Sequence, residues 1–348
     1  MGRKNNSGGP FAFAVVVVLF ALLASVTIVP MVGTADGATE STSSRSRLNV
    51  VSTISILQDF VEQIGGDRVS CISLVTGNEN PHTYATTTAD RIAIENASVF
   101  VEIGGDAGPE LEPWAQDLLD SSDNKDLIVC EAAKNISLVD GNPHVWMDPE
   151  NAKIMVKEIA SSLMKADPDG ADIYRSGMEN YIQRINQTEN HILQEIAPHN
   201  GTKVIASHPA FLYFFNFIGF KQVDLLVDVP GQEPSSQHVS QIIDEIKEQN
   251  ISLIVTMPQF PTPVIEQIQE DTGVKSVEIT ALIGPLNTTT YLGMLEYDTQ
   301  AIISTLSGST SENSHSTPAI VYVSGLAGIT AIALLAVLIY RRQRRREE

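Results

Sequence analysis

The chain has 348 residues, with 42 acidic and 22 basic side chains and a formal net charge of −20. So acidic a protein is repelled by the phosphates of nucleic acid, and we expect no nucleic-acid partner. Hydrophobic residues make up 43% of the chain, which excludes a disordered protein and suffices for two domains of ordinary size. Cys71 and Cys130 are too few for a disulfide framework, and both lie in apolar runs, so we expect buried free thiols. A single bridge between them outside the cell is the alternative.

Both ends of the chain carry apolar segments. Residues 1–38 hold Arg3 and Lys4 and then an apolar run, a pattern that predicts a secretory signal peptide or an uncleaved N-terminal anchor. Residues 39–47 are rich in serine and threonine, which predicts a spacer. We therefore expect the rest of the chain to be exported.

The C-terminal apolar segment covers residues 318–340, which as a transmembrane helix would extend ~34 Å and cross the hydrocarbon core. Arginines fill the tail at residues 341–348, and the positive-inside rule places this tail in the cytoplasm. The serine-rich residues 306–317 predict a flexible stalk. We expect a binding domain outside the cell membrane, held by a single-pass C-terminal anchor.

Six Asn-X-Ser/Thr triplets lie between these two ends. They permit N-glycosylation of an exported chain, although such triplets also arise by chance. Their asparagines are Asn96, Asn135, Asn186, Asn200, Asn250 and Asn287.

From residue 48 the pattern alternates between strands and helices. Residues 48–165 hold a first lobe, with helices through 56–64 and 90–96, the second capped by Thr88. Strands separated by helices predict a parallel sheet with helices on both faces. The strands are expected at residues 48–53, 69–75, 98–103 and 126–132.

A long helix follows this lobe. Asp148 and Pro149 start one helix, which the break at residues 166–170 ends. Another helix runs from about residue 172 to 196, well above the ~11–12 residues of a typical globular helix. It forms most of a connecting region at residues 166–199.

Residues 200–305 repeat the organisation of the first lobe. A helix is expected at 236–249, with strands at 203–207, 223–228, 252–257 and 275–280. The predicted fold class is therefore α/β, with two similar αβ lobes that contain parallel sheets and are joined by one long backbone helix.

Three histidines, His82, His144 and His208, each lie next to a proline. Imidazole is the commonest side-chain metal ligand, and three imidazoles around one ion suit zinc. Each histidine follows a predicted strand, and ligands of open parallel sheets bind beyond the carboxyl ends of the strands. We expect these three side chains to converge as metal ligands in the cleft between the lobes. The other histidines are expected to be solvated or structural: His191, His199, His238 and His315.

The motifs around the three histidines resemble those of the zinc- and manganese-type solute-binding proteins of ABC transporters. Pro-His-Thr-Tyr at 81–84, Asn-Pro-His-Val-Trp-Met-Asp-Pro at 142–149 and Ser-His-Pro-Ala-Phe at 207–211 are similar to the three ligand loops of that family. The resemblance covers about residues 48–305. It implies two αβ lobes bridged by one long helix, with the metal ion between them.

The family usually supplies a carboxylate as fourth ligand, and its position falls on Thr280 in this chain. The candidates for the fourth ligand are therefore Thr280, Glu278, which a regular strand would place on the same face, Glu79 near His82, and water. Manganese favours oxygen ligands, whereas zinc accepts three imidazoles and one further group. The missing carboxylate thus favours Zn²⁺ as the bound ion, with Mn²⁺ as the second choice.

The resemblance implies an extracytoplasmic protein that captures a divalent metal ion and delivers it to an ABC permease and its ATPase. We expect a monomer without catalytic activity. Two other functions stay open. A zinc hydrolase or hydratase would use the same three histidines and a bound water, although no general base accompanies them. A surface adhesin or metal store would need no transporter.

Overall fold

The computed structural model describes residues 47–227, 234–259 and 263–308. The predicted signal at 1–38, the transmembrane helix at 318–340 and the basic tail at 341–348 lie outside these residues, as do most of the spacer and of the stalk. Among the described residues, no helix is both long enough and apolar enough to cross a bilayer.

The first lobe contains a four-stranded sheet in the order β2-β1-β3-β4, and every neighbouring pair is parallel. Its strands are β1 (Leu48–Ile54), β2 (Val69–Val75), β3 (Val99–Glu102) and β4 (Ile128–Glu131). Its helices are α2 (Ser55–Gly65), α3 (Thr88–Glu95), α4 (Gly108–Leu111), α5 (Trp114–Asp120) and α6 (Pro149–Ala166). Because all four strands are parallel, their carboxyl ends share one edge of the sheet. The four predicted strands are confirmed, with ends that shift by two residues at most.

The second lobe repeats this topology, with a parallel sheet in the order β6-β5-β7-β8. Its strands are β5 (Lys203–Ala206), β6 (Lys221–Leu225), β7 (Leu253–Thr256) and β8 (Lys275–Glu278). Its helices are α8 (Leu212–Ile218), α9 (Ser236–Gln249), α10 (Val264–Thr272) and α11 (Tyr291–Ser307). Of these helices, only α9 is predicted from the sequence, whereas α8, α10 and α11 are not. The end signals of α11 are nonetheless present, since Thr290 caps its first turn and Gly308 ends it in the left-handed conformation.

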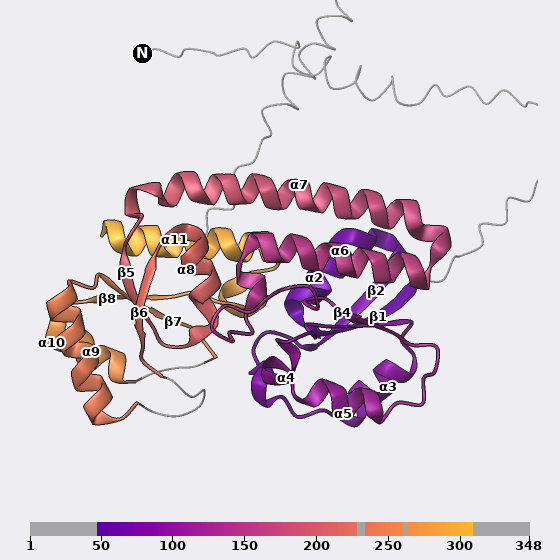
Figure 1. Ribbon diagram of the computed structural model, residues 1–348, viewed down its shortest axis with the longest axis horizontal. Helices are drawn as coiled ribbons and strands as arrows, with labels where there is room; N and C mark the ends of the chain where they lie inside the picture. Colours follow the sequence, from indigo (N-terminus) through magenta and orange to yellow (C-terminus); the bar gives the residue numbers. More distant parts are fainter. Residues whose placement is uncertain (1–46, 228–233, 260–262, 309–348) are drawn as a thin grey trace, which may run out of the picture. The chain divides into compact units, whose positions relative to one another are not determined.

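Helix α7 (Ala171–Ile196) connects the two lobes. It begins one residue before the predicted start at about residue 172. It packs against α2 and α6 of the first lobe and against α8 and α11 of the second, and Figure 1 shows it running along both. Its buried residues are spaced three, four or seven apart, which places them on one face of the helix. They are Tyr174, Tyr181, Ile185, Thr188, Ile192 and Ile196.

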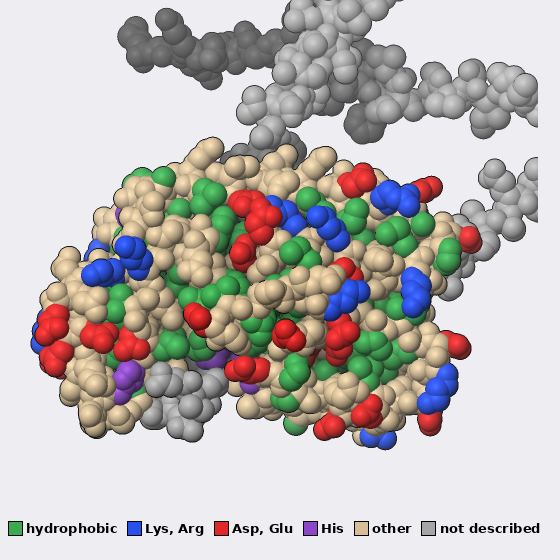
Figure 2. Space-filling model, in the orientation of Figure 1, with side chains coloured by type: hydrophobic (Ala, Val, Ile, Leu, Met, Phe, Trp, Pro, Cys, Tyr) green, Lys and Arg blue, Asp and Glu red, His purple; other side chains and the backbone are tan. Residues whose placement is uncertain are grey.

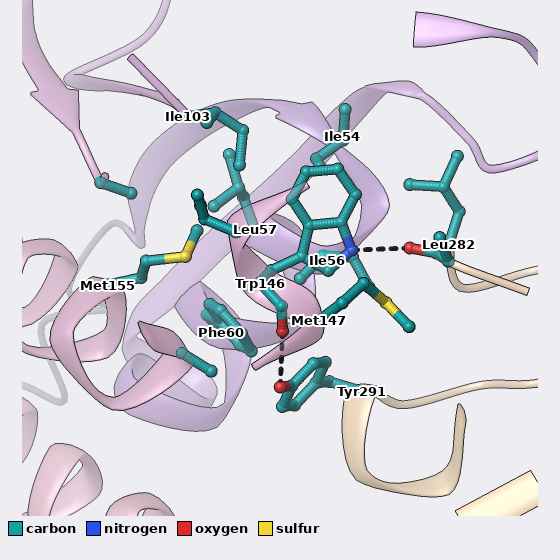
Figure 3. Close-up of a cluster of buried hydrophobic side chains, with 14 of the residues drawn as sticks. Ile54, Ile56, Leu57, Phe60, Ile103, Trp146, Met147, Met155, Leu282 and Tyr291 are labelled. Carbon is teal, nitrogen blue, oxygen red and sulfur yellow. Dashed lines mark hydrogen bonds between the residues drawn. The ribbon is translucent and has the colours of Figure 1, made fainter. Parts of the chain in front are cut away.

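One main hydrophobic core extends across both lobes. Figure 3 shows part of it, in which Phe60 and Trp146 of the first lobe lie beside Tyr291 of the second. The rings of Phe60 and Tyr291 meet edge to face, with centroids 5.0 Å apart. A smaller cluster fills the space between sheet β6-β5-β7-β8 and the helices α9 and α10, with Ile205 and Ile242 among its members. The lobes therefore share a core, while α9 and α10 are held by a satellite core of their own.

Two local predictions need correction. Helix α3 is capped by Thr87, not Thr88, because the Thr87 hydroxyl accepts from the Asp90 backbone and the Asp90 carboxylate accepts in return, which completes a capping box. Cys71 and Cys130 are free thiols, but only Cys130 is fully buried. Burial raises the pKa of the Cys71 thiol to about 12 and that of Cys130 to about 11, so neither is a reactive thiolate.

Candidate metal centre

The first histidine, His82, lies in a 3-10 turn (Pro81–Thr83) that follows β2. The side chain of Asn80 accepts a hydrogen bond from the His82 backbone N–H at 2.9 Å and so fixes the turn. The indole Nε1 of Trp114 donates to the carbonyl of Pro81 at 2.8 Å. The His82 ring itself has its Nδ1 3.0 Å from the backbone carbonyl oxygen of Glu110. Because a carbonyl only accepts, Nδ1 carries the proton and Nε2 presents a lone pair.

The second histidine, His144, follows β4 and is oriented by Asn142. The Asn142 side-chain nitrogen donates to the carbonyl of Pro209 at 2.7 Å, so its Oδ1 is the oxygen that accepts from His144. This oxygen lies 2.9 Å from both the backbone nitrogen and the ring Nδ1 of His144. As in His82, the proton is on Nδ1 and the lone pair on Nε2. Hydrogen bonds of this kind orient the histidine ligands of metal sites.

The third histidine, His208, comes two residues after β5. Its backbone is extended, with φ −147° and ψ 148°, as expected of a residue that precedes a proline. Its side chain is buried and meets the other two rings at centroid distances of 5.7 Å from His82 and 5.2 Å from His144.

The three imidazoles form a donor set in which His82 and His144 have the spacing of two zinc ligands. The Nε2 atoms of His82 and His144 lie 3.3 Å apart, and one ligand atom from each of the three histidines lies within 4.8 Å of the other two. Two lone pairs at this distance repel each other, unless a proton or a cation lies between them. Nitrogens bound to one tetrahedral ion at ~2.0–2.1 Å are roughly 3.3–3.4 Å apart. Among the described residues, no other group of histidine, cysteine or acidic side chains meets the same criterion.

The surroundings keep two of these imidazoles neutral. Burial, together with the neighbouring His208 and His82, holds the pKa of His144 well below its usual 6.5. Burial, with His82 beside it, lowers the pKa of His208 to about 3. Neutral imidazole is the form that binds a metal ion, so protons compete poorly for this site.

Residues around His144 also join the two lobes. The Tyr213 hydroxyl of α8 donates to the Asn142 carbonyl at 2.9 Å, and the indole nitrogen of Trp146 donates to the carbonyl of Ala281 at 2.7 Å. Tyr291 in turn donates to the carbonyl of Trp146 at 2.7 Å, which Figure 3 shows. The centre therefore lies at the junction of the lobes, where Figure 2 shows only small areas of histidine at the surface.

The three candidates for a fourth ligand are all engaged elsewhere or exposed. The Thr280 hydroxyl is buried and exchanges hydrogen bonds with the backbone of Leu282. Glu79 is exposed, and both of its carboxylate oxygens accept from Thr76. Glu278 is exposed at the end of β8.

The histidines expected to be structural have other surroundings. His191 lies exposed on α7, 3.5 Å from Glu195, and the Nε2 of His238 lies 2.8 Å from the carbonyl oxygen of Leu225. His199 ends a 3-10 turn, and His315 is outside the described residues. Neither Asn142 nor the Glu110 carbonyl is predicted from the sequence as a group that orients these histidines. Only Asn142 had a signal, its place two residues before His144.

Comparison with known proteins places the chain in a family. Residues 50–305 match the family model described as zinc-uptake complex component A, periplasmic. A manganese-binding lipoprotein, MntA, of Halalkalibacterium halodurans is 27% identical over 81% of this chain and 97% of its own length. The high-affinity zinc uptake system protein ZnuA of Bacillus subtilis is 25% identical over 76% of this chain and 88% of its own.

Solved structures agree with these matches. A crystal structure of ZnuA is 28% identical in sequence, covers 75% of this chain and all of its own, and superimposes with a TM-score of 0.67. A zinc-bound deletion mutant of ZnuA, also 28% identical, has a TM-score of 0.65. The family model matches far more than half of the present chain. The chain therefore belongs to the family of periplasmic component A proteins of zinc-uptake complexes.

Proposed function

We propose that this protein binds one divalent metal ion between its two lobes, through His82, His144 and His208, and delivers it to an ABC permease. The observation that carries the proposal is the distance of 3.3 Å between the Nε2 atoms of His82 and His144. The Glu110 carbonyl and the Asn142 side chain fix the tautomers of these two rings, so that both Nε2 atoms present a lone pair. The zinc-uptake and manganese-binding relatives support it, and they give no support to a zinc hydrolase or a surface adhesin. The protein acts by binding and release and is no enzyme.

Zinc is the preferred ion, and water is its fourth ligand. Three neutral imidazoles suit zinc, while manganese favours oxygen ligands, and Thr280 offers a hydroxyl in place of a carboxylate. The hydroxyl of Thr280 and the carboxylates of Glu79 and Glu278 would each have to leave their present positions to reach the ion. A bound water needs no such rearrangement.

Equilibrium dialysis with metal analysis tests this proposal. We expect one zinc ion per chain and weaker binding of manganese. Stoichiometric manganese binding without preference for zinc would refute the assignment. The variant Thr280→Asp gives a second test of the metal preference. A carboxylate at this position should raise the affinity for manganese relative to zinc by about tenfold. Glu79→Gln and Glu278→Gln should leave zinc binding unchanged if water is the fourth ligand.

The domain limits and the anchor belong to the same proposal. We place the lobes at residues 48–165 and 200–305, the connecting region at 166–199 and the anchor at 318–340. The acidic domain would then reach the permease from a membrane tether. Extraction of membranes with alkaline carbonate should leave the full chain in the pellet and release a chain that ends at residue 308. Release of both would refute the C-terminal anchor.

A further inference from the structure

The six Asn-X-Ser/Thr triplets all lie in the part of the chain that the structure describes, and each of their asparagines is exposed. Three of them directly precede strands: Asn96 before β3, Asn200 before β5 and Asn250 before β7. The metal-binding histidines follow strands instead. In sheets whose strands are all parallel, the amino ends and the carboxyl ends lie at opposite edges. These three triplets therefore lie at the edges that face away from the metal centre.

Asn200 and Asn250 flank the same part of the second lobe. Strands β5 and β7 are neighbours, with Val204 opposite Leu253, so the segments that enter them run side by side. The backbone nitrogen of Ser252 donates to the carbonyl of Lys203 at 3.3 Å, which extends the pairing to these segments. The two triplets thus meet at one edge of the sheet, while His208 follows the other end of β5, ~13 Å of strand away.

Residues of both triplets line a polar hollow. Its volume is about 520 Å³, and its lining includes Thr202, the third residue of the first triplet, and both Asn250 and Ser252 of the second. Lys247 and Thr272 contribute further polar groups. Hydroxyl, amide and ammonium groups of this kind are the partners that a sugar hydroxyl uses.

The side chains of these two asparagines are presented for modification. Within the described ranges, neither amide nitrogen donates a hydrogen bond, whereas Asn96 donates to the Ile92 carbonyl and Asn135 to Glu158, both at 2.7 Å. Asn250 ends α9 in the left-handed conformation, at φ 53°, so its side chain projects from a turn. Asn200 is also exposed in a turn, before Gly201 at φ +81°, and its side-chain oxygen lies toward Gly219.

We propose that Asn200 and Asn250 carry N-linked glycans, which cover the edge of the second lobe that lies opposite the metal centre. The sugar donor is an activated sugar phosphate used by a glycosyltransferase on the exported chain. The asparagine Nδ2 attacks the anomeric carbon, a C–N bond forms, the C–O bond to phosphate breaks, the phosphate leaves and Nδ2 loses one proton. The inference rests on the extracytoplasmic location in the proposed function, but not on metal binding.

Mass spectrometry of peptides from the full chain, purified from the cells that produce it, tests the proposal. We expect the peptides with Asn200 and Asn250 to carry sugar mass on the asparagine. Asn200→Asp and Asn250→Asp should each remove one glycan, since aspartate keeps the size of asparagine and tolerates the left-handed turn. Unmodified asparagine at both positions in membrane-recovered protein would overturn it.

A matched pair of variants separates loss of the triplet from loss of folding. Thr202→Ser keeps the triplet and the hydroxyl that donates to the His199 carbonyl, so the glycan should remain. Thr202→Val removes the triplet with little change in side-chain shape, so the glycan on Asn200 should disappear while that on Asn250 persists. Zinc binding should be equal in both variants. A glycan retained in Thr202→Val would contradict the assignment to Asn200, and failure of zinc binding alone would bear only on the proposed function.

Discussion

The two lobes have the same strand order but hold their histidines by different means. In the first lobe, His82 and His144 are oriented by hydrogen bonds from Nδ1 to the Glu110 carbonyl and to the Asn142 side chain. In the second lobe, His208 is set by an extended backbone before Pro209 and by burial, with only 1% of its surface exposed. The first lobe therefore presents the Nε2 lone pairs of two oriented imidazoles, and the second lobe adds the His208 ring beside them.

Asn142 contacts the histidine loops of both lobes. Its oxygen fixes the tautomer of His144, and its nitrogen reaches the carbonyl of Pro209, next to His208. One side chain thus connects a ligand loop of each lobe. The orientation of His144 and the joining of the lobes therefore depend on the same residue.

The largest effect is expected from removal of one ligand in either lobe. His144→Ala and His208→Ala should each weaken zinc binding by at least about 100-fold, because loss of a ligand exceeds the ~10–100-fold typical of residues that orient ligands. Zinc titration with a competing chelator measures the loss. His191→Ala, exposed on α7, is the control and should bind zinc as the unmodified chain does. Retention of affinity within about threefold in His208→Ala would mean that the first lobe binds the ion alone.

A smaller effect is expected at the residue that links the lobes. Asn142→Ala leaves all three imidazoles in place but frees the His144 tautomer and breaks the bond to Pro209, so we expect zinc affinity to fall ~10–100-fold. Tyr213→Phe is the matched comparison, because it removes the hydroxyl bonded to the Asn142 carbonyl and leaves the Asn142 side chain intact. Equal losses in the two variants would show that joining the lobes, and not orienting His144, is the role of Asn142.

Much of this organisation can be predicted from the sequence, because period and end signals are local. Helix α7 is predicted to within one residue, and α9 at its exact limits of 236 and 249, because apolar spacing and end residues coincide there. Short helices such as α4 and α5 are not predicted, because four to seven residues are too few to show a helical period.

The three histidines of the candidate site can be predicted from the sequence, but the groups that orient them cannot. Proline-flanked histidines after strands predict the convergence of His82, His144 and His208. The Glu110 carbonyl is a backbone atom, which no side-chain pattern reveals. The bonds from Asn142 to Pro209 and from Trp146 to Ala281 join residues that are far apart in the chain, so they follow only from the packing of one lobe on the other.

The smallest effect concerns a buried carboxyl group in each lobe. Glu112 in the first lobe accepts from the Gly104 backbone, and Asp298 in the second accepts from that of Thr280, both at 3.0 Å. The other oxygen of each finds no hydrogen-bond partner among the described residues. Burial raises the pKa of Glu112 to about 8 and that of Asp298 well above its usual range. Burial thus favours the neutral form of both groups in the folded protein, and a pKa of about 8 keeps Glu112 mostly protonated at neutral pH.

A raised pKa in the folded state makes stability fall as the pH rises. The unfolded chain ionises Glu112 near its ordinary pKa of ~4.3, whereas the folded chain keeps the proton until about pH 8, so stability is lost progressively across this window. Glu112→Gln keeps the acceptor for Gly104 but has no proton to lose. We therefore expect its free energy of unfolding at pH 8 to exceed that of the unmodified chain by at least ~1 kcal/mol, and by less at pH 5. Asp298→Asn should act alike in the second lobe. Urea unfolding at both pH values measures the gap, with the exposed Glu110→Gln as control. A pH slope in Glu112→Gln equal to that of the unmodified chain would mean that the Glu112 carboxyl is already ionised in the folded lobe.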